Sequence, residues 1–255
     1  MLYRAFAPAG GLLPFIARYW RISGSLDQEE RIDLQPDGGV SLLLNLGAGP
    51  RSERFERCFD DRGPLIIGAM RRGDRQTLTS ACDLFGITFK PGGFTHLHRY
   101  LPMHQVCDDV RCFDRALFPN TADILRHGVP YLDRFYSERL RHPRYSLLPV
   151  VAVVEAHKGR VRMDHLMRSQ STTARQLERQ FKQQVGITPK EFIDLTRFNQ
   201  AFGMVQQHGA TRSLMDIAWD CGYYDHAHLT KAFQFHMGRP PSDFVLSHSS
   251  KIAAT

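Results

Sequence analysis

The stretch TTARQLERQFKQQVGITPKEF, residues 172–192, is echoed by DHAHLTKAFQFHMGRPPSDF, residues 225–244. Five residues recur at one constant offset: Leu177, Phe181, Gly186, Pro189 and Phe192 correspond to Leu229, Phe233, Gly238, Pro241 and Phe244. Just upstream, at an offset one residue shorter, Met163, Leu166 and Met167 correspond to Leu214, Ile217 and Ala218. A change of offset is tolerated in a turn and not inside a helix, so it predicts two helices joined by a turn in each copy.

The second copy shows these elements most clearly. Ser213 with Asp216 is an N-cap pattern, and the apolar residues that follow are spaced as on one face of a helix: Leu214, Ile217, Ala218 and Cys221. Gly222 suits the turn, and Asp225 suits the cap of a new helix that ends at Gly238. The copy therefore predicts a helix, a tight turn and a second helix.

The first copy follows the same plan. Thr173 and Gln176 form a capping-box pair, and Gly186 stops the helix. In both copies the second helix has an apolar back and a polar, largely basic front: Arg175, Arg179 and Lys182 in one, His226, Thr230 and Lys231 in the other. This is the form of a helix that enters the major groove of DNA.

The motifs RQLERQF, GITPKEF and IAWDCGYYDHAHLTKAFQFHMGRPPSDF resemble the DNA-binding domain of the AraC/XylS family of bacterial transcription regulators. The resemblance covers roughly the last hundred residues. It implies an all-α domain over 146–255 with two helix-turn-helix units, about 161–186 and 213–238. The first turn, RSQST at 168–172, departs from the family pattern because it lacks the usual glycine.

The resemblance also implies which side chains contact DNA. They are Arg175, Glu178, Arg179, Lys182, His226, Ala227, Thr230 and Lys231. Glu178 has two open roles, either accepting from a cytosine amino group or orienting a neighbouring arginine. Charged residues on a helix are commonly only solvated surface, and the duplicated motif is what favours a function here. Trp219 is interpreted as a core or interface aromatic.

The first half of the chain has a sequence pattern typical of strands and turns. Residues 32–34 and 41–47 are predicted to form a hairpin around QPDGGV, and 65–70 and 84–90 are further strands. The segments PFIARYW (14–20), QPDGG (35–39) and GITFKPGGF (86–94) are similar to the sensor domain of one subgroup of the same family. We therefore expect a two-domain α+β chain with a β-rich, barrel-like N-terminal domain over 1–145.

Helices are expected to link the two domains and the two units. Residues 95–141 place apolar side chains at helical spacing and are interpreted as bracing helices, and HPRY at 142–145 is the expected boundary. A helix over SLLPVVAVVEAHKG, residues 146–159, is predicted to end at Gly159. A long helix over 188–207, ending at Gly209, is predicted to join the units rigidly, since two recognition helices must lie ~34 Å apart to enter successive turns of the major groove.

The amino-acid composition indicates which kinds of partner and which cellular compartment to expect. The net charge of +7 and the isoelectric point near 9.3 favour an acidic partner, and nucleic acid is the commonest one. The five cysteines form no CxxC pair, which favours a reducing cytoplasm: they are Cys58, Cys82, Cys107, Cys112 and Cys221. No apolar stretch approaches the ~20 residues that span a bilayer, so no membrane is expected as a partner.

The expected partner is an operator or promoter in double-stranded DNA, and no cofactor or metal is expected. RNA polymerase, a second copy of the chain and a small-molecule effector of unknown identity stay open as further partners. The four residues selected as candidates for an effector pocket in the N-terminal half are Trp20, Asp37, Asn45 and Phe89, because such a site needs an aromatic wall and a few polar groups.

An alternative from another class is a metal-dependent β-barrel enzyme with a helical appendix. It rests on the pair His96 and His98, with His104 nearby, because two imidazoles on one face of a strand can bind a metal. No acidic residue completes an obvious ligand set, and no catalytic residue is identified, so the sequence favours a regulator that is not an enzyme.

Overall fold

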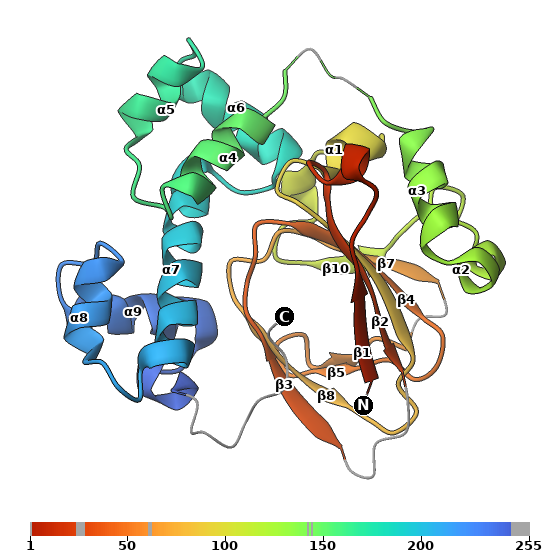
Figure 1. The fold of residues 1–255 in the computed structure, drawn as a ribbon, viewed down its shortest axis with the longest axis horizontal. Helices are drawn as coiled ribbons and strands as arrows, with labels where there is room; N and C mark the ends of the chain where they lie inside the picture. Colours follow the sequence, from red (N-terminus) through yellow and green to blue (C-terminus); the bar gives the residue numbers. More distant parts are fainter. Residues whose placement is uncertain (1, 24–28, 61–62, 142, 144, 246–255) are drawn as a thin grey trace.

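The computed structural model describes residues 2–23, 29–60, 63–141, 143 and 145–245. A β-rich N-terminal domain lies beside an all-helical C-terminal domain (Figure 1). The expected boundary at HPRY includes His142 and Arg144, which lie outside the described residues. Within those residues, no helix combines the length and the apolar character needed to cross a membrane.

The N-terminal domain contains two antiparallel sheets. The larger has six strands in the order β1 (Leu2–Phe6), β2 (Ile16–Ser23), β9 (Leu84–Phe89), β4 (Val40–Asn45), β7 (Pro64–Ile67) and β10 (Val110–Cys112). The smaller has the order β3 (Glu30–Leu34), β8 (Asp74–Leu78), β5 (Arg51–Ser52) and β6 (Arg57–Cys58). The strands predicted at 65–70 and 84–90 are β7 and β9.

The predicted hairpin around QPDGGV is wrong, although both of its strands exist. β3 pairs with β8, whereas β4 pairs with β9 and β7, so the turn at residues 35–39 carries the chain from one sheet to the other. The reason is burial. β4 is apolar and largely buried, which requires a central position in the larger sheet, while β3 is mostly exposed. The turn chemistry is satisfied either way, since the Asp37 carboxylate accepts from the Gly39 amide at 3.2 Å.

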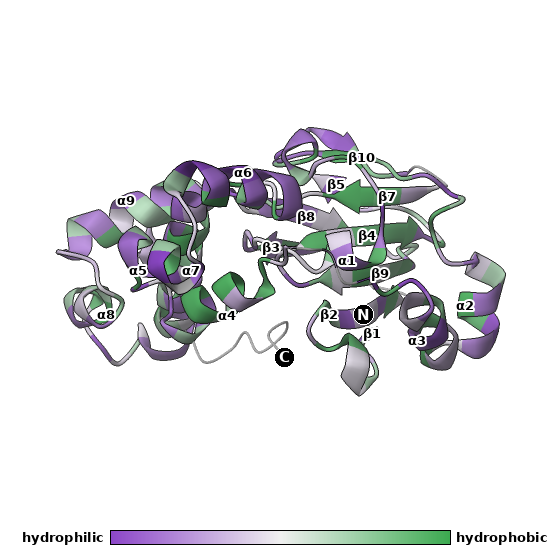
Figure 2. Cartoon of the chain, turned by 90° about the horizontal axis from the view of Figure 1, so that it is seen from above, coloured by the Kyte–Doolittle hydropathy of each residue, from purple (hydrophilic) through white to green (hydrophobic). Residues whose placement is uncertain are grey.

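The larger sheet is covered on both faces. One face packs with the smaller sheet through a cluster that includes Leu43, Leu65 and Leu78. The other face carries a larger cluster covered by short helices: η1 (Gly10–Leu12), α1 (Phe94–Leu97), η2 (Met103–Gln105), α2 (Thr121–His127) and α3 (Val129–Ser137). Figure 2 shows the apolar central strands β4, β7 and β9 lying inside these more polar outer elements. The domain is thus barrel-like with two facing sheets that do not close into a barrel.

In the part of the C-terminal domain that the structure describes, there are six α-helices and a 3-10 turn. They are α4 (Leu148–Ala156), α5 (Met163–Ser169), α6 (Ala174–Gln184), α7 (Pro189–His208), α8 (Leu214–Asp220), α9 (His226–Met237) and η3 (Pro241–Phe244). The pairs α5/α6 and α8/α9 are the two helix-turn-helix units, at the two ends of α7 (Figure 1). This confirms the expected architecture of two units joined by one long helix.

The joining helix α7 begins and ends where the sequence predicts. Thr188 and Glu191 cap its start reciprocally, and Gly209 is its C-cap. Twenty residues in α-helical geometry are about 30 Å long. Its buried side carries Phe198 and Phe202, which contact Phe233 of α9 with ring centroids 5.0 and 5.9 Å away. A continuous helix therefore fixes the distance between the two units.

The N-terminal domain contacts both units. Near the first, η2 packs against α6, and a β-carbon on Gly186 would lie 2.9 Å from the Met103 carbonyl oxygen. Near the second, the Gly73 amide donates to the His236 carbonyl at 2.7 Å, and the His236 ring bonds the Arg71 carbonyl at 2.6 Å. The domain thus touches the end of each recognition helix.

Arg71 forms the central ion pair between the domains. Its guanidinium contacts the Asp108 carboxylate at 2.5 Å and the Glu191 carboxylate at 2.7 Å, so it joins the β domain to the first turn of α7. A second pair joins Arg239, just after α9, to Asp33 of β3 at 2.7 Å. These pairs hold the pKa values of the three carboxylates below their ordinary range, although burial acts in the opposite direction.

Candidate nucleic-acid interface

The recognition helix of the first unit is α6. The Thr173 hydroxyl accepts from the Gln176 amide at 3.3 Å, and the Gln176 side chain caps the helix start in return. Leu177 and Phe181 are fully buried, which fixes the rotation of the helix. Its opposite face is exposed and carries the predicted contacts Arg175, Glu178, Arg179 and Lys182. Glu178 and Lys182 form an ion pair with nitrogen and oxygen 3.2 Å apart.

The recognition helix of the second unit is α9. Asp225 caps it by accepting from the His228 amide at 2.7 Å, and buried Leu229 and Phe233 set its rotation. The predicted contacts His226, Ala227 and Lys231 are exposed. Thr230 is half-buried and its hydroxyl donates to the His226 carbonyl at 2.9 Å, so that hydroxyl is partly committed to its own helix.

The two turns have the same backbone geometry despite different residues. Ser171 takes a left-handed conformation with φ of 47°, and Gly222 takes it with φ of 75° in the second unit. The following amides close equivalent hydrogen bonds, from Thr172 to the Met167 carbonyl at 3.1 Å and from Tyr223 to the Ala218 carbonyl at 2.9 Å. Ser171 therefore stands where the family pattern has glycine.

Tyr224 is the extra residue of the second unit. Thr172 and Tyr223 correspond at the shorter offset, and the N-caps Thr173 and Asp225 correspond at the longer one, so the additional residue lies between Tyr223 and Asp225. Its side chain is 86% exposed, and its carbonyl accepts from the Trp219 indole at 3.3 Å. Trp219 is itself 59% exposed, so it does not lie in the core of the chain. From the sequence alone, the change of offset between the two copies could have indicated that Tyr224 is an additional residue whose side chain projects beside the recognition helix.

Comparisons with known proteins agree with this geometry. Residues 166–246 match a family described as a helix-turn-helix domain, and 107 residues are 31% identical to the HTH-type transcriptional activator RhaS of Escherichia coli. The C-terminal domain is of the AraC/XylS type. The match covers 42% of this chain and 38% of the relative, so the chain spans well under half of the curated relatives it matches. Residues 4–111 match a domain family of unknown function, DUF6597.

Two solved structures resemble this chain in part. ToxT of Vibrio cholerae matches over 96% of this chain and 98% of its own, with 10% identity and a TM-score of 0.47. The C-terminal domain of AraT, a response regulator of Geobacillus stearothermophilus, matches over 43% of this chain and 95% of its own, with 18% identity and a TM-score of 0.35.

The serine in the first turn of the AraC/XylS-type domain gives a prediction. Replacing Ser171 with Gly should raise the free energy of unfolding by roughly 1 kcal/mol, because a β-carbon is strained in the left-handed region. Chemical denaturation of the purified chain measures this. The matched control is Gly222→Ser, which should destabilise by a similar amount, and equal stability of both variants and the unchanged chain would contradict the interpretation.

The histidines behind the enzyme alternative have structural partners. The His96 ring bonds the Arg141 carbonyl at 3.1 Å and the Ser146 hydroxyl at 3.0 Å. His98 stacks on Phe94 with centroids 4.7 Å apart, and burial lowers its pKa to about 3. Across the described ranges, no three His, Cys, Asp or Glu side chains gather closely enough to hold a metal ion. The AraC/XylS-type relatives are transcription regulators and not enzymes.

The four candidate effector residues separate into two groups. Asp37 and Phe89 line a cleft between the β domain and the AraC/XylS-type domain. Trp20 and Asn45 do not line it. The Trp20 indole covers Gly86 and donates to the Thr88 hydroxyl at 3.1 Å, while the Asn45 amide donates to the Phe59 carbonyl. The sequence offered no signal for the helical wall of this cleft, because that wall comes from the other domain.

Proposed function

We propose that this protein is a sequence-specific DNA-binding transcription regulator. The observation that carries the proposal is the pair of helix-turn-helix units at the two ends of α7, each with a buried apolar stripe and an exposed polar face. Two exposed recognition helices on one rigid connector suit successive turns of a major groove. The similarity to a transcriptional activator over the C-terminal domain supports the same function.

The exposed side chains suggest a division of roles. Arg175 and Arg179 can bond guanine edges or phosphates from α6, and Ala227 can contact a thymine methyl from α9. His226 and Lys231 offer further hydrogen-bond donors on α9. Glu178 binds Lys182 through one carboxylate oxygen, so the other oxygen can accept from cytosine or orient a neighbouring arginine.

The N-terminal domain supplies the control in this proposal. It contacts both units and α7, so any partner that changes its position changes how the recognition helices are presented. A small-molecule effector, RNA polymerase and a second copy of the chain are the partners we assign to it. A regulator of this kind acts on the chromosome, and we therefore place it in the bacterial cytoplasm.

The function is tested through Arg179. Replacing Arg179 with Ala should weaken binding to a duplex selected by the unchanged protein by about 1–3 kcal/mol, roughly 5- to 150-fold, and relax base preference at one position. Gel-shift titration and footprinting measure both effects. Arg134→Ala in α3 removes the same charge far from α6 and should leave affinity nearly unchanged. The assignment fails if R179A keeps the footprint and affinity of the unchanged protein.

A further inference from the structure

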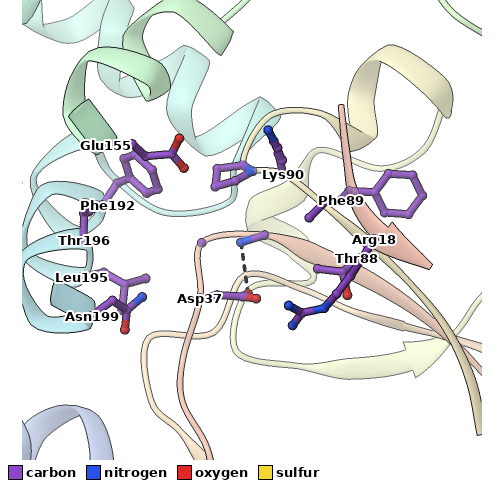
Figure 3. A pocket seen from close by; sticks show the side chains of 14 residues that line it. Arg18, Asp37, Thr88, Phe89, Lys90, Glu155, Phe192, Leu195, Thr196 and Asn199 are labelled. Atoms are coloured by element: carbon purple, nitrogen blue, oxygen red, sulfur yellow. Dashed lines mark hydrogen bonds between the residues drawn. The ribbon is translucent and has the colours of Figure 1, made fainter. Parts of the chain in front are cut away.

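A cleft of about 360 Å³ lies between the two domains. The β domain contributes the start of β2, the turn that contains Asp37, and the end of β9; the helical domain contributes Glu155 of α4 and one side of α7. Figure 3 shows Asp37 between the α7 side chains and the β-domain wall. The glycine next to Asp37 allows this close approach, since a β-carbon on Gly38 would lie 2.8 Å from the Phe192 ring.

Asp37 is an acceptor with spare capacity. Its carboxylate is reached by solvent but surrounded by protein, and its one hydrogen bond comes from the Gly39 amide at 3.2 Å. Burial raises the pKa of Asp37, although the Gly39 amide and the positive charge of Arg18 oppose the shift. Among the described residues it forms no ion pair, so its negative charge has no direct counter-ion.

Asn199 provides a second acceptor on the α7 wall. Its amide nitrogen donates to the Pro36 carbonyl at 3.0 Å, and this bond fixes which end of the amide is oxygen. The oxygen is buried and finds no hydrogen-bond partner in the described part of the chain. A buried acceptor without a donor is costly, and a bound donor would relieve it.

The rest of the cleft is amphipathic. Phe192 and Leu195 of α7 and Pro91 of the β domain provide apolar walls. Glu155 adds another carboxylate, and burial raises the pKa of Glu155 against the positive charge of Lys90. Arg18 and Lys90 are exposed and extend from the β-domain side. The acceptors that still need partners thus lie beside apolar surface.

We propose that this cleft binds a small molecule with a protonated amine on an apolar body. The ammonium group donates to the Asp37 carboxylate, and the apolar body lies against Phe192 and Leu195 of the facing wall. Such a ligand touches both the β domain and α7, so its binding energy depends on how the two are placed. An effect of this ligand on DNA binding rests on the proposed function, whereas binding of the ligand in the cleft does not.

Binding is tested with three probes that share a phenyl ring and differ in the head group. These are 2-phenylethylamine, phenylacetate and 2-phenylethanol, titrated by calorimetry into the full chain without DNA. The amine is expected to saturate at least tenfold more tightly than the other two. Asp37→Asn should remove this preference, because the amide keeps the bond from Gly39 but loses the charge. The matched control Asp123→Asn, on the distant helix α2, should retain it.

Any of three results would overturn the proposal. One is phenylacetate or phenylethanol binding as tightly as the amine, which would assign the cleft to Arg18 and Lys90 or to apolar contact alone. The other two are an unchanged amine affinity in D37N and the absence of saturable amine binding to the unchanged protein. A parallel gel shift separates the amine-binding proposal from the proposed function. If R179A loses DNA binding and keeps its preference for the amine, both proposals are supported. If the unchanged protein prefers the amine but binds no duplex, only the assignment of the cleft survives.

Discussion

Replacing Phe233 with Ala is expected to lower the free energy of unfolding by about 3–5 kcal/mol. Phe233 is fully buried on α9 and contacts Phe198 and Phe202 of α7 and Phe244 of η3, with ring centroids 5.0 to 5.9 Å away. The cavity left by the ring would be shared by three elements that cannot all close around it. Because α9 is oriented through this contact, DNA binding should be lost in proportion to unfolding.

Urea denaturation followed by circular dichroism measures the stability of F233A. The neighbouring Phe235 is the matched control, since it is the same residue on the same helix but 49% exposed, and its replacement by Ala should cost far less. Phe181, fully buried at the corresponding position of the first unit, should behave like Phe233. Loss of DNA binding by F233A with an unchanged unfolding transition would mean that Phe233 acts as a contact and not as core.

The second large effect is expected at Gly159, where the segment after α4 crosses α7. Its φ is 70°, and a β-carbon would lie 2.5 Å from the Arg197 amide nitrogen and from the Ile193 carbonyl oxygen. Gly159→Ala should therefore destabilise the chain by about 2–5 kcal/mol, from left-handed strain and from overpacking against backbone. The Arg197 guanidinium, which donates to the Gly159 carbonyl at 3.1 Å, would also be displaced.

Gly203 provides a control of opposite sign for this experiment. It lies within α7 and a β-carbon there would meet nothing within 4 Å, so Gly203→Ala should stabilise the helix by up to about 1 kcal/mol. Thermal unfolding of both variants gives the comparison. Equal melting temperatures for G159A and the unchanged protein would show that α4 can move away from α7 without cost.

The helical half could be predicted from sequence because its signals are local. Capping pairs such as Thr173 with Gln176, stop glycines such as Gly186 and Gly238, and the apolar spacing each act within a few residues. Even the turn without glycine follows the same path, since Ser171 adopts the left-handed conformation that Gly222 adopts in the second unit. The residues assigned to DNA contact remain predictions; all of them except the half-buried Thr230 are exposed, which is compatible with that role.

The β domain and the cleft could not be predicted in the same way. The turn at Asp37 has the chemistry of a hairpin, but the pairing of β4 is decided by burial among strands distant in sequence. Residue type alone points to Asp37 and Phe89 as candidate effector contacts. Asn199 and Leu195, which line the same cleft, come from a helix assigned to the other domain. Contacts between domains produce no periodic pattern in a single sequence, so the cleft could be identified only from the structure.

The two reading faces at the ends of α7 are not alike. One carries arginines on α6, and the other carries histidine and lysine on α9 with the additional Tyr224 beside it. A rigid connector about 30 Å long permits neither unit to take the place of the other on DNA. Under the proposed function, a chain with two different recognition helices would bind an asymmetric DNA site in only one direction. The order of the bases in that site would then set the orientation of the chain on the DNA, and therefore the side toward which the β domain points.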